Sequence, residues 1–307
     1  MLGFVTDPAG TAGITLRELP EPEPGPHDVV VEVAAYAVNR GELALIERRA
    51  DGWAPGQDVA GVVVAAAADG TGPAVGTRVA GIADQGGWSE RVPVPSHRTA
   101  ALPDSVNFAA AAALPVAGLT ALRALRTGGP LLGRQVLVTG ASGGVGSFAV
   151  QLARAAGAVV SALVSSASRV DAVASLGAHQ VLTELGDDAG PFDLVLDGVG
   201  GQVLTSAVRR LAPGGQVTAY GVAGGERSDL AFYDFGAAAP GGRLEGFFIY
   251  STGEETFGAD LALLSGLIAD GTLTPQVGTP RGWQETPAAV EALRARQVTG
   301  KLVLVRG

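Results

Sequence analysis

The first hundred residues alternate hydrophobic and polar positions in the manner of β-strands. Valines alternate with polar residues in residues 27–35, as a half-buried strand requires. Short apolar runs follow at residues 58–67 and 76–83, separated by glycine turns, and helical periodicity is nearly missing up to about residue 105. This pattern predicts a mostly antiparallel β domain at the start of the chain.

The pattern changes at Phe108. A helical stretch interrupted at Pro115 leads into a compact apolar strand, and strand and helix patterns alternate from there. The predicted strands cover residues 135–140, 159–164, 179–182, 192–199 and 215–222, and the predicted helices cover residues 145–158 and 168–178. Alternation at this spacing predicts an α/β fold, with βαβ units around a doubly wound parallel sheet of the Rossmann type.

The end of the chain returns to the first domain. Two amphipathic helices are expected at residues 261–273 and 286–297, and a last strand at residues 301–305 can rejoin the β domain. We therefore predict two domains, one formed by residues 1–113 and 252–307 and the other by residues 114–251.

Composition narrows the chemistry. The 307 residues include no cysteine, which excludes disulfides, thiolate nucleophiles and cysteine-ligated metals, so redox chemistry needs a borrowed cofactor. A net charge of −9 repels a phosphate backbone, so we expect no nucleic-acid partner. No apolar run approaches the roughly 20 residues of a membrane span, and the first residues lack the pattern of a signal peptide. We therefore expect a cytoplasmic protein.

A glycine-rich turn follows the first strand of the α/β part. Gly140, Gly143, Gly144 and Gly146 lie between a β-branched strand and an amphipathic helix. Glycine lets the backbone approach a pyrophosphate, and the N–H groups that open the helix supply an anion site. We expect Ser142 and Val145 of the same turn to contact the cofactor. The other interpretation is an ordinary tight turn in a chain with 46 glycines.

The end of the next strand indicates which dinucleotide is bound. NAD enzymes usually place Asp or Glu there for the ribose 2′-hydroxyl, whereas this chain has Ser165 and Ser166, followed by Arg169. Two hydroxyls and a guanidinium can bind a 2′-phosphate, which a carboxylate would repel. NADPH is therefore the expected cofactor. The alternative is that the serines cap a helix and the arginine is a solvated surface charge.

Several motifs in the same order resemble the medium-chain dehydrogenase/reductase superfamily, and its zinc-free quinone oxidoreductases most of all. The segments that carry the resemblance are AAYAVNRGEL, PGQDVAGVV, GWSERVPVP, LPVAGLTAL, VLVTGASGGVG, DGVGG and GKLVLV. The resemblance implies a GroES-like substrate domain beside the Rossmann domain. It also implies a homodimer, with an edge strand at residues 244–250 pairing across a twofold axis.

The resemblance also argues against a catalytic zinc. Where zinc-dependent relatives have cysteine, histidine and cysteine ligands, this chain has Asn39, Gln57 and Val116. Asp58, which replaces a glutamate of the zinc motif, is expected to be structural. The three histidines lie far apart in sequence. Without a Lewis acid, alcohol oxidation is disfavoured, whereas hydride addition to a conjugated acceptor is feasible.

The resemblance implies further site residues. Asn39 would lie near the nicotinamide and orient the ring or the acceptor carbonyl, although a turn-forming role is equally compatible with its sequence position. Aromatic candidates for the acceptor pocket are Tyr36, Trp53 and Tyr250, which buried core positions would also explain. Further cofactor contacts are expected from Thr120, Gly198, Val199, Tyr220, Gly221, Phe247, Phe248 and Lys301.

Three functions fit these observations. The first is an NADPH-dependent, zinc-independent reductase of quinones or α,β-unsaturated carbonyls. The second is an enoyl-thioester reductase of lipid or polyketide synthesis, which shares the fold, the cofactor and the hydride chemistry. The third, of another class, is a sensor that binds NADPH without turnover. The sequence separates the first two poorly, because both need the same conjugated carbonyl.

Overall fold

The computed structural model describes residues 1–236 and 239–306. The chain forms two compact units, Met1–Leu119 with Gly253–Gly307 (unit 1) and Thr120–Thr252 (unit 2). The domain boundaries predicted from the sequence lie after residues 113 and 251. In the structure, the chain passes from one unit to the other after Leu119 and Thr252. No helix among the described residues is both long and apolar enough to cross a membrane.

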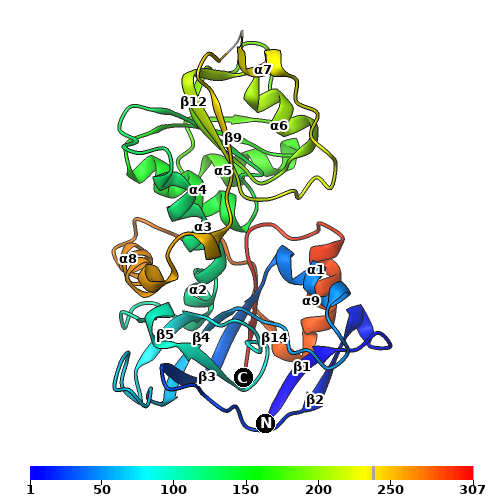
Figure 1. Ribbon diagram of the computed structural model, residues 1–307, viewed down its shortest axis with the longest axis vertical. Helices are drawn as coiled ribbons and strands as arrows, with labels where there is room; N and C mark the ends of the chain where they lie inside the picture. The colour runs from blue at the N-terminus through cyan, green and yellow to red at the C-terminus, as the bar shows by residue number, and fades with distance from the viewer. Residues whose placement is uncertain (237–238, 307) are drawn as a thin grey trace. The chain divides into compact units, whose positions relative to one another are not determined.

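Unit 1 is built on a seven-stranded sheet in which almost every neighbouring pair is antiparallel (Figure 1). The order is β14-β15-β3-β4-β5-β7, and β6 also pairs with β3. The strands are β3 (Asp28–Val38), β4 (Asp58–Ala65), β5 (Arg78–Ile82), β6 (Arg91–Pro95), β7 (Thr99–Ala101), β14 (Arg281–Gly282) and β15 (Leu302–Val305). A separate hairpin joins β1 (Leu2–Thr6) to β2 (Ile14–Glu18). The last strand pairs with β3, so the end of the chain completes the sheet of the first domain.

Helices also contribute to unit 1, including one that the sequence pattern did not predict. They are α1 (Arg40–Arg48), α2 (Phe108–Ala112), α8 (Phe257–Ala269) and α9 (Thr286–Arg294), and α3 (Pro115–Arg126) crosses into unit 2. The first of these was missed because its nine residues are short for a periodicity analysis. Its signal was the spacing of Asn39 and Glu42, which is that of a capping box.

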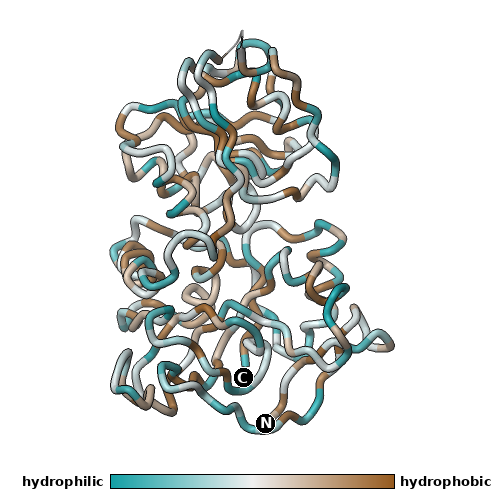
Figure 2. The backbone as a smooth tube through the Cα atoms, in the orientation of Figure 1, coloured by the Kyte–Doolittle hydropathy of each residue, from teal (hydrophilic) through white to brown (hydrophobic). Residues whose placement is uncertain are grey.

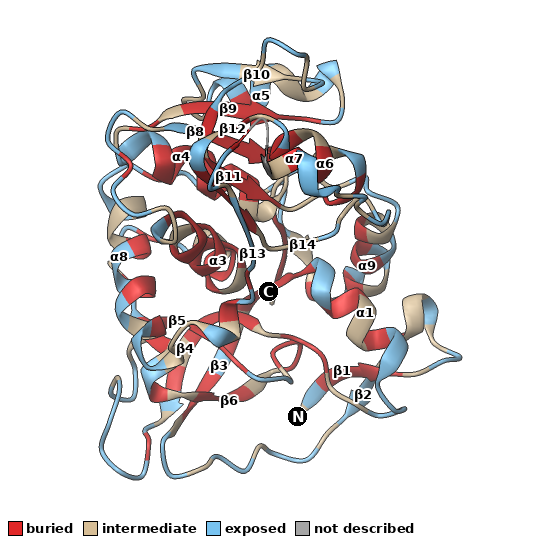
Figure 3. Cartoon of the chain, turned by 45° about the horizontal axis from the view of Figure 1, so that its top comes forward, coloured by how far each residue is buried: buried red, intermediate tan, exposed pale blue. Residues whose placement is uncertain are grey.

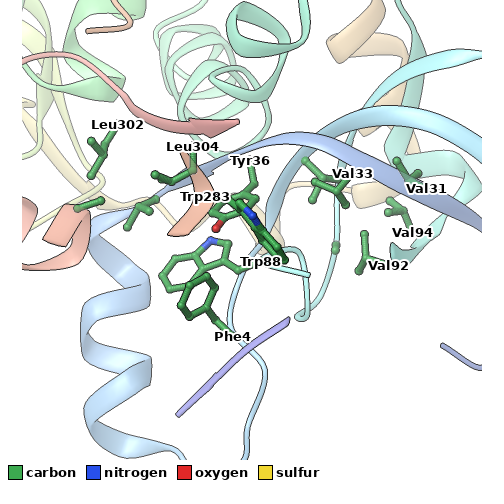
Figure 4. Packing of buried hydrophobic residues seen from close by; sticks show 14 of the residues in the cluster. Phe4, Val31, Val33, Tyr36, Trp88, Val92, Val94, Trp283, Leu302 and Leu304 are labelled. Carbon is green, nitrogen blue, oxygen red and sulfur yellow. The ribbon is translucent and has the colours of Figure 1, made fainter. Parts of the chain in front are cut away.

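The core of unit 1 is aromatic at its centre (Figure 4). The rings of Tyr36 and Trp88 stack with centroids 6.1 Å apart, and Phe4 meets Trp283 edge to face at 6.2 Å. The Tyr36 hydroxyl donates to Thr286 Oγ1 at 2.6 Å, because Thr286 uses its own proton on a backbone carbonyl. Tyr36 is fully buried. Tyr36 therefore lies in the packed core, and its expected role in the acceptor pocket stays a prediction.

Unit 2 is the predicted doubly wound domain. Its six parallel strands have the order β10-β9-β8-β11-β12-β13. The strands are β8 (Gln135–Thr139), β9 (Val159–Leu163), β10 (Gln180–Leu182), β11 (Phe192–Asp197), β12 (Leu211–Ala219) and β13 (Arg243–Gly246), and the helices are α4 (Gly144–Ala155), α5 (Val170–Ala174), α6 (Gly201–Val208) and α7 (Phe232–Gly236). The strand order reverses between β8 and β11. Ligands of such sheets bind at that point, beyond the carboxyl ends of the strands.

Burial explains why the strand patterns of unit 2 were easy to recognise. The inner strands are buried along most of their length (Figure 3), and apolar stretches of the chain run through this unit (Figure 2). Parallel strands covered on both faces read as continuous apolar runs. The α/β fold with a second, mostly β domain is therefore confirmed.

Candidate functional site

The glycine turn of unit 2 has the geometry of a phosphate cradle. Gly140 follows β8 with φ of 60°, a conformation that favours glycine, and the Gly143 N–H donates to the Gly140 carbonyl at 2.9 Å. A Cβ at Gly146 would lie 2.4 Å from that carbonyl oxygen, so the helix α4 packs directly on the turn. A Cβ at Gly143 would meet only the Gly140 oxygen at 3.2 Å. Gly146 is thus required by packing, whereas Gly143 keeps the backbone accessible to a ligand.

Ser142 and Arg169 are brought together at the edge of this turn. The Arg169 guanidinium donates to Ser142 Oγ at 2.9 Å, although the two residues lie 27 positions apart. Ser142 is buried, while Arg169 is half-buried at the end of the short 3-10 helix Ala167–Arg169 that follows β9. Ser165 is exposed and Ser166 is half-buried beside it. One guanidinium and two serines therefore lie next to the glycine turn, and no carboxylate occurs in residues 164–168.

A buried carboxylate, Asp197, lies at the point where the strand order reverses. Its Oδ1 accepts from the Thr139 hydroxyl at 2.6 Å, which ties the carboxyl ends of β8 and β11 together. Its Oδ2 accepts the Gly200 N–H at 2.9 Å. Burial raises the pKa of Asp197, and the bonds from Thr139 and Gly200 oppose that rise. Gly198 and Val199 of this loop were predicted from the sequence, whereas the carboxylate of Asp197 that holds the loop was not.

The other predicted cofactor residues of unit 2 include Gly198 and Tyr220 near Asp197, and Phe247 and Phe248 after β13. A Cβ at Gly198 would lie 2.6 Å from the Tyr220 ring, so that glycine makes room for the tyrosine. Burial, followed by the charge of Asp197, raises the pKa of Tyr220. Phe247 is buried, whereas Phe248 is 63% exposed with its ring 5.3 Å from that of Tyr250. These positions, with those of Thr120, Val145, Val199 and Gly221, stay predictions as cofactor or pocket residues.

Unit 1 contains a second candidate site, a buried polar cluster formed by Asn39, Glu42, Asp58 and Lys301. The Lys301 ammonium donates to Asn39 Oδ1 and to Asp58 Oδ2, each at 2.7 Å. The Asn39 amide also donates to Asp58 Oδ2, at 2.9 Å. The Val116 N–H donates to Asp58 Oδ1 at 2.7 Å. The Lys301–Asp58 ion pair is therefore buried in this unit and hydrogen-bonded to Asn39 and Val116, as burial of charge requires.

Glu42 is the most strongly perturbed member of the cluster. It is fully buried, and its two oxygens accept the backbone N–H groups of Asn39 at 2.6 Å and Gln57 at 2.9 Å. Burial and then the nearby Asp58 carboxylate raise the pKa of Glu42 to about 8, although the two backbone bonds and Lys301 oppose the rise. Near neutral pH, Glu42 is thus largely protonated.

Comparison with known proteins identifies the family. Residues 25–104 match the model of the alcohol dehydrogenase GroES-like domain, and residues 144–266 match that of the zinc-binding dehydrogenases. The human synaptic vesicle membrane protein VAT-1 homolog is 30% identical over 95% of this chain and 82% of its own length. The chain belongs to the medium-chain dehydrogenase/reductase superfamily. The motifs that carried the resemblance in the sequence are thereby confirmed.

Solved structures place this superfamily member in the quinone oxidoreductase-like branch. A mycobacterial protein solved in complex with NADPH has a TM-score of 0.89 and 27% identity, over 99% of this chain and 100% of that one. A quinone oxidoreductase of Pseudomonas syringae has a TM-score of 0.87 and 26% identity, over 99% of each chain. The spectinabilin polyketide synthase protein NorB of Streptomyces orinoci is 35% identical over 91% of this chain, which spans 13% of its length.

The positions of the superfamily's zinc ligands have other uses in this member. Asn39 bonds Lys301 and Asp58, Gln57 donates its N–H to Glu42, and Val116 contributes only its backbone N–H. Valine has no atom that binds zinc. Lys301 is 4% exposed and bonded inside unit 1, and its predicted contact with the cofactor stays a prediction. Asp58, which was expected to be structural, is the centre of the cluster, because it accepts from Asn39, Val116 and Lys301.

The histidines and Trp53 lie apart from this cluster. His27 and His97 line a common cavity of about 340 Å³, and His27 Nδ1 lies 2.5 Å from Asp69 Oδ2. In the part of the chain that the structure describes, no group of three or more His, Cys, Asp or Glu residues is placed to hold a metal ion. Trp53 is half-buried and donates to Gln85 at 2.6 Å, so its role as a pocket residue stays a prediction.

Proposed function

We propose that this protein is an NADPH-dependent reductase that transfers hydride to a quinone or an α,β-unsaturated carbonyl. The observation that carries the proposal is the contact of Arg169 with Ser142, which holds a guanidinium at the edge of the glycine turn. There it can pair with the 2′-phosphate while the helix N–H groups bind the pyrophosphate. The NADPH complex of the mycobacterial relative supports the same cofactor.

The residues present fit this cofactor. The cradle accepts a phosphate because Gly143 has no side chain to fill it, and Ser165, Ser166 and Arg169 supply donors in place of a carboxylate. When bound, NADPH supplies the hydride. The chain's own residues hold the phosphates and orient the loop that Asp197 anchors. In unit 1, Asn39, Lys301 and Asp58 form a polar group where zinc-dependent relatives have metal ligands, so substrate polarisation depends on hydrogen bonds.

Replacement of Arg169 by alanine tests the cofactor assignment. A charge-assisted hydrogen bond contributes about 1.5–3 kcal/mol, so we expect the Kd for NADPH to rise roughly 10- to 100-fold, with little change for NADH. Isothermal titration calorimetry with both cofactors measures the difference. Arg154→Ala, which removes an exposed arginine from the same unit, is the matched control. Equal weakening of both cofactors by Arg169→Ala contradicts the assignment.

A panel of acceptors tests the reaction. We expect NADPH oxidation with 1,4-naphthoquinone or an enone, because a conjugated acceptor takes hydride without a metal. Preference for an enoyl thioester would favour the second candidate, an enoyl reductase, which the similarity to part of a polyketide synthase protein supports. Tight NADPH binding without turnover of any conjugated acceptor would instead favour a sensor and exclude the reductase.

We also propose that the protein forms a homodimer through β13. This edge strand is exposed at Arg243, Leu244 and Glu245, and pairs only with β12 in the described residues. If two copies pair antiparallel about Leu244, Arg243 lies opposite Glu245 of the partner subunit, which is a favourable cross-strand pair. The cytoplasmic location is a further proposal that rests on the sequence.

Charge reversal on β13 tests the dimer. Arg243→Glu places like charges opposite each other, so we expect the mass from light scattering to fall from dimer to monomer. Arg243→Lys keeps the charge and serves as the control. A wild-type monomer, or a dimer that survives the reversal unchanged, overturns the proposed pairing.

A further inference from the structure

The partners of Asn39 determine which way its amide faces. An ammonium has only donors, so the atom 2.7 Å from Lys301 must be the amide oxygen. An ionised carboxylate only accepts, so the atom 2.9 Å from Asp58 must be the amide nitrogen. One N–H of the amide is therefore used by Asp58, and its carbonyl is used by Lys301. Among the described residues, no further acceptor of the second amide N–H is present.

The lysine in this network is unusual for the chain. The sequence has 21 basic residues, and Lys301 is the one lysine among them. The other basic residues counted here are all arginines. The single lysine is buried, with 4% of its surface exposed. An ammonium is compact enough to bond Asn39 Oδ1 and Asp58 Oδ2 at once, whereas a guanidinium is a broad planar fork.

We propose that Lys301 and Asp58 are positioning residues that lock Asn39 as a hydrogen-bond donor to the oxygen of the acceptor. The inference rests on the proposed function and deepens it. Asn39 lies at the start of α1 and is 9% exposed, the most exposed member of the cluster, whereas Lys301 is 4% exposed and Glu42 and Asp58 are fully buried. With its carbonyl bonded to Lys301 and one N–H bonded to Asp58, the amide has a second N–H left to donate. An N–H donor here would stabilise a carbonyl oxygen that gains negative charge, as the oxygen of a quinone or conjugated carbonyl does when hydride adds.

The chemistry of the step is consistent with a donor alone. Hydride adds to the electron-poor carbon, the π electrons move onto the carbonyl oxygen, and the resulting enolate or hydroquinone anion takes a proton from water. Asn39 stabilises the oxygen while its charge develops. The reverse reaction on a simple alcohol needs a base for the hydroxyl proton. Asn39 does not supply one, because a carboxamide is too weak a base to take that proton.

A double-mutant cycle tests the inference. Asn39→Ala and Lys301→Met are each expected to lower kcat for the enone roughly 100-fold, with the Kd for NADPH changed less than about twofold. The double variant should be no slower than either single variant, because Lys301 acts through Asn39. Multiplicative losses overturn the proposal. So does a Lys301→Met variant that binds NADPH weakly and keeps its kcat, because Lys301 would then be a cofactor ligand.

Two controls keep the test decisive. Lys301→Met leaves Asp58 as an unpaired buried charge, so the neutral pair Asp58→Asn with Lys301→Met replaces it if the single variant does not fold. Arg294→Met removes a paired cation from the surface of the same unit and should leave kcat unchanged.

A readout without turnover separates this inference from the proposed function. In NMR spectra of the cofactor-free protein, the side-chain amide protons of Asn39 should exchange slowly, and exchange should accelerate at least tenfold in the neutral pair. Fast exchange in the wild type overturns the locked amide. Slow exchange in a protein that reduces no acceptor supports the lock and contradicts the reductase.

Discussion

Gly143→Ala is expected to weaken NADPH binding on the order of 100-fold while leaving the protein folded. Its Cβ would meet only the Gly140 oxygen, at 3.2 Å, and the backbone of Gly143 has an extended conformation that alanine adopts readily. The methyl group would occupy the space through which a pyrophosphate approaches the helix N–H groups. Loss of about two charge-assisted hydrogen bonds accounts for the size of the effect. Calorimetry for Kd and thermal unfolding for Tm measure the two consequences separately.

The neighbouring Gly146→Ala is expected to act on the fold instead. Its Cβ would lie 2.4 Å from the Gly140 oxygen and 2.7 Å from Ala141 Cα, so α4 must move away from the turn. Overpacking of this kind costs about 1–3 kcal/mol, which lowers Tm by several degrees. Gly266→Ala in α8, where a Cβ meets no neighbour, is the control. For the first variant, Gly143→Ala, an NADPH affinity equal to that of the wild type would show that the glycine turn does not bind the pyrophosphate.

Stability is expected to fall as pH rises from about 5 to 8, because of Glu42. The pKa of this carboxyl is near 4.5 in the unfolded chain and about 8 in the folded protein. The folded state therefore holds a proton that the unfolded state has released, so the free energy of unfolding decreases with pH through this window and levels off above it. The full loss amounts to a few kcal/mol. Urea unfolding at several pH values measures it.

Glu42→Gln should remove that pH dependence. Glutamine does not titrate, but its amide places an N–H group against one of the two backbone donors, so the variant is less stable by roughly 1–3 kcal/mol at pH 5. Glu47→Gln alters an exposed carboxylate on the same helix and should preserve the slope. If the slope of wild type and Glu42→Gln were equal between pH 5 and 8, the protonation of Glu42 would not be its cause.

The sequence predicted most of the fold because the relevant signals are local. Continuous apolar runs marked the inner strands of unit 2, and turn glycines marked their ends. The missed helix α1 shows the limit of this approach. Nine residues give little periodicity, and the spacing of Asn39 and Glu42 was not recognised as a helix start.

The candidate site was predicted less completely. Ser142 and Arg169 were both named, but only the parallel pairing of β8 with β9 brings them to 2.9 Å. Tyr36 was assigned to a pocket because an aromatic residue has the same sequence signature in a core and in a binding site. Its stacking on Trp88 is decided by residues more than fifty positions away.

By itself, the sequence determined the superfamily, the glycine turn and the loss of the zinc ligands, since each depends on which residues follow one another. Only the tertiary structure decided that Lys301 bonds Asn39 and Asp58, because β15 must return from the end of the chain to pair with β3. It likewise decided that Asp197 bridges β8 and β11. Buried polar groups must find partners wherever the fold provides them, and those partners lie far apart in the chain.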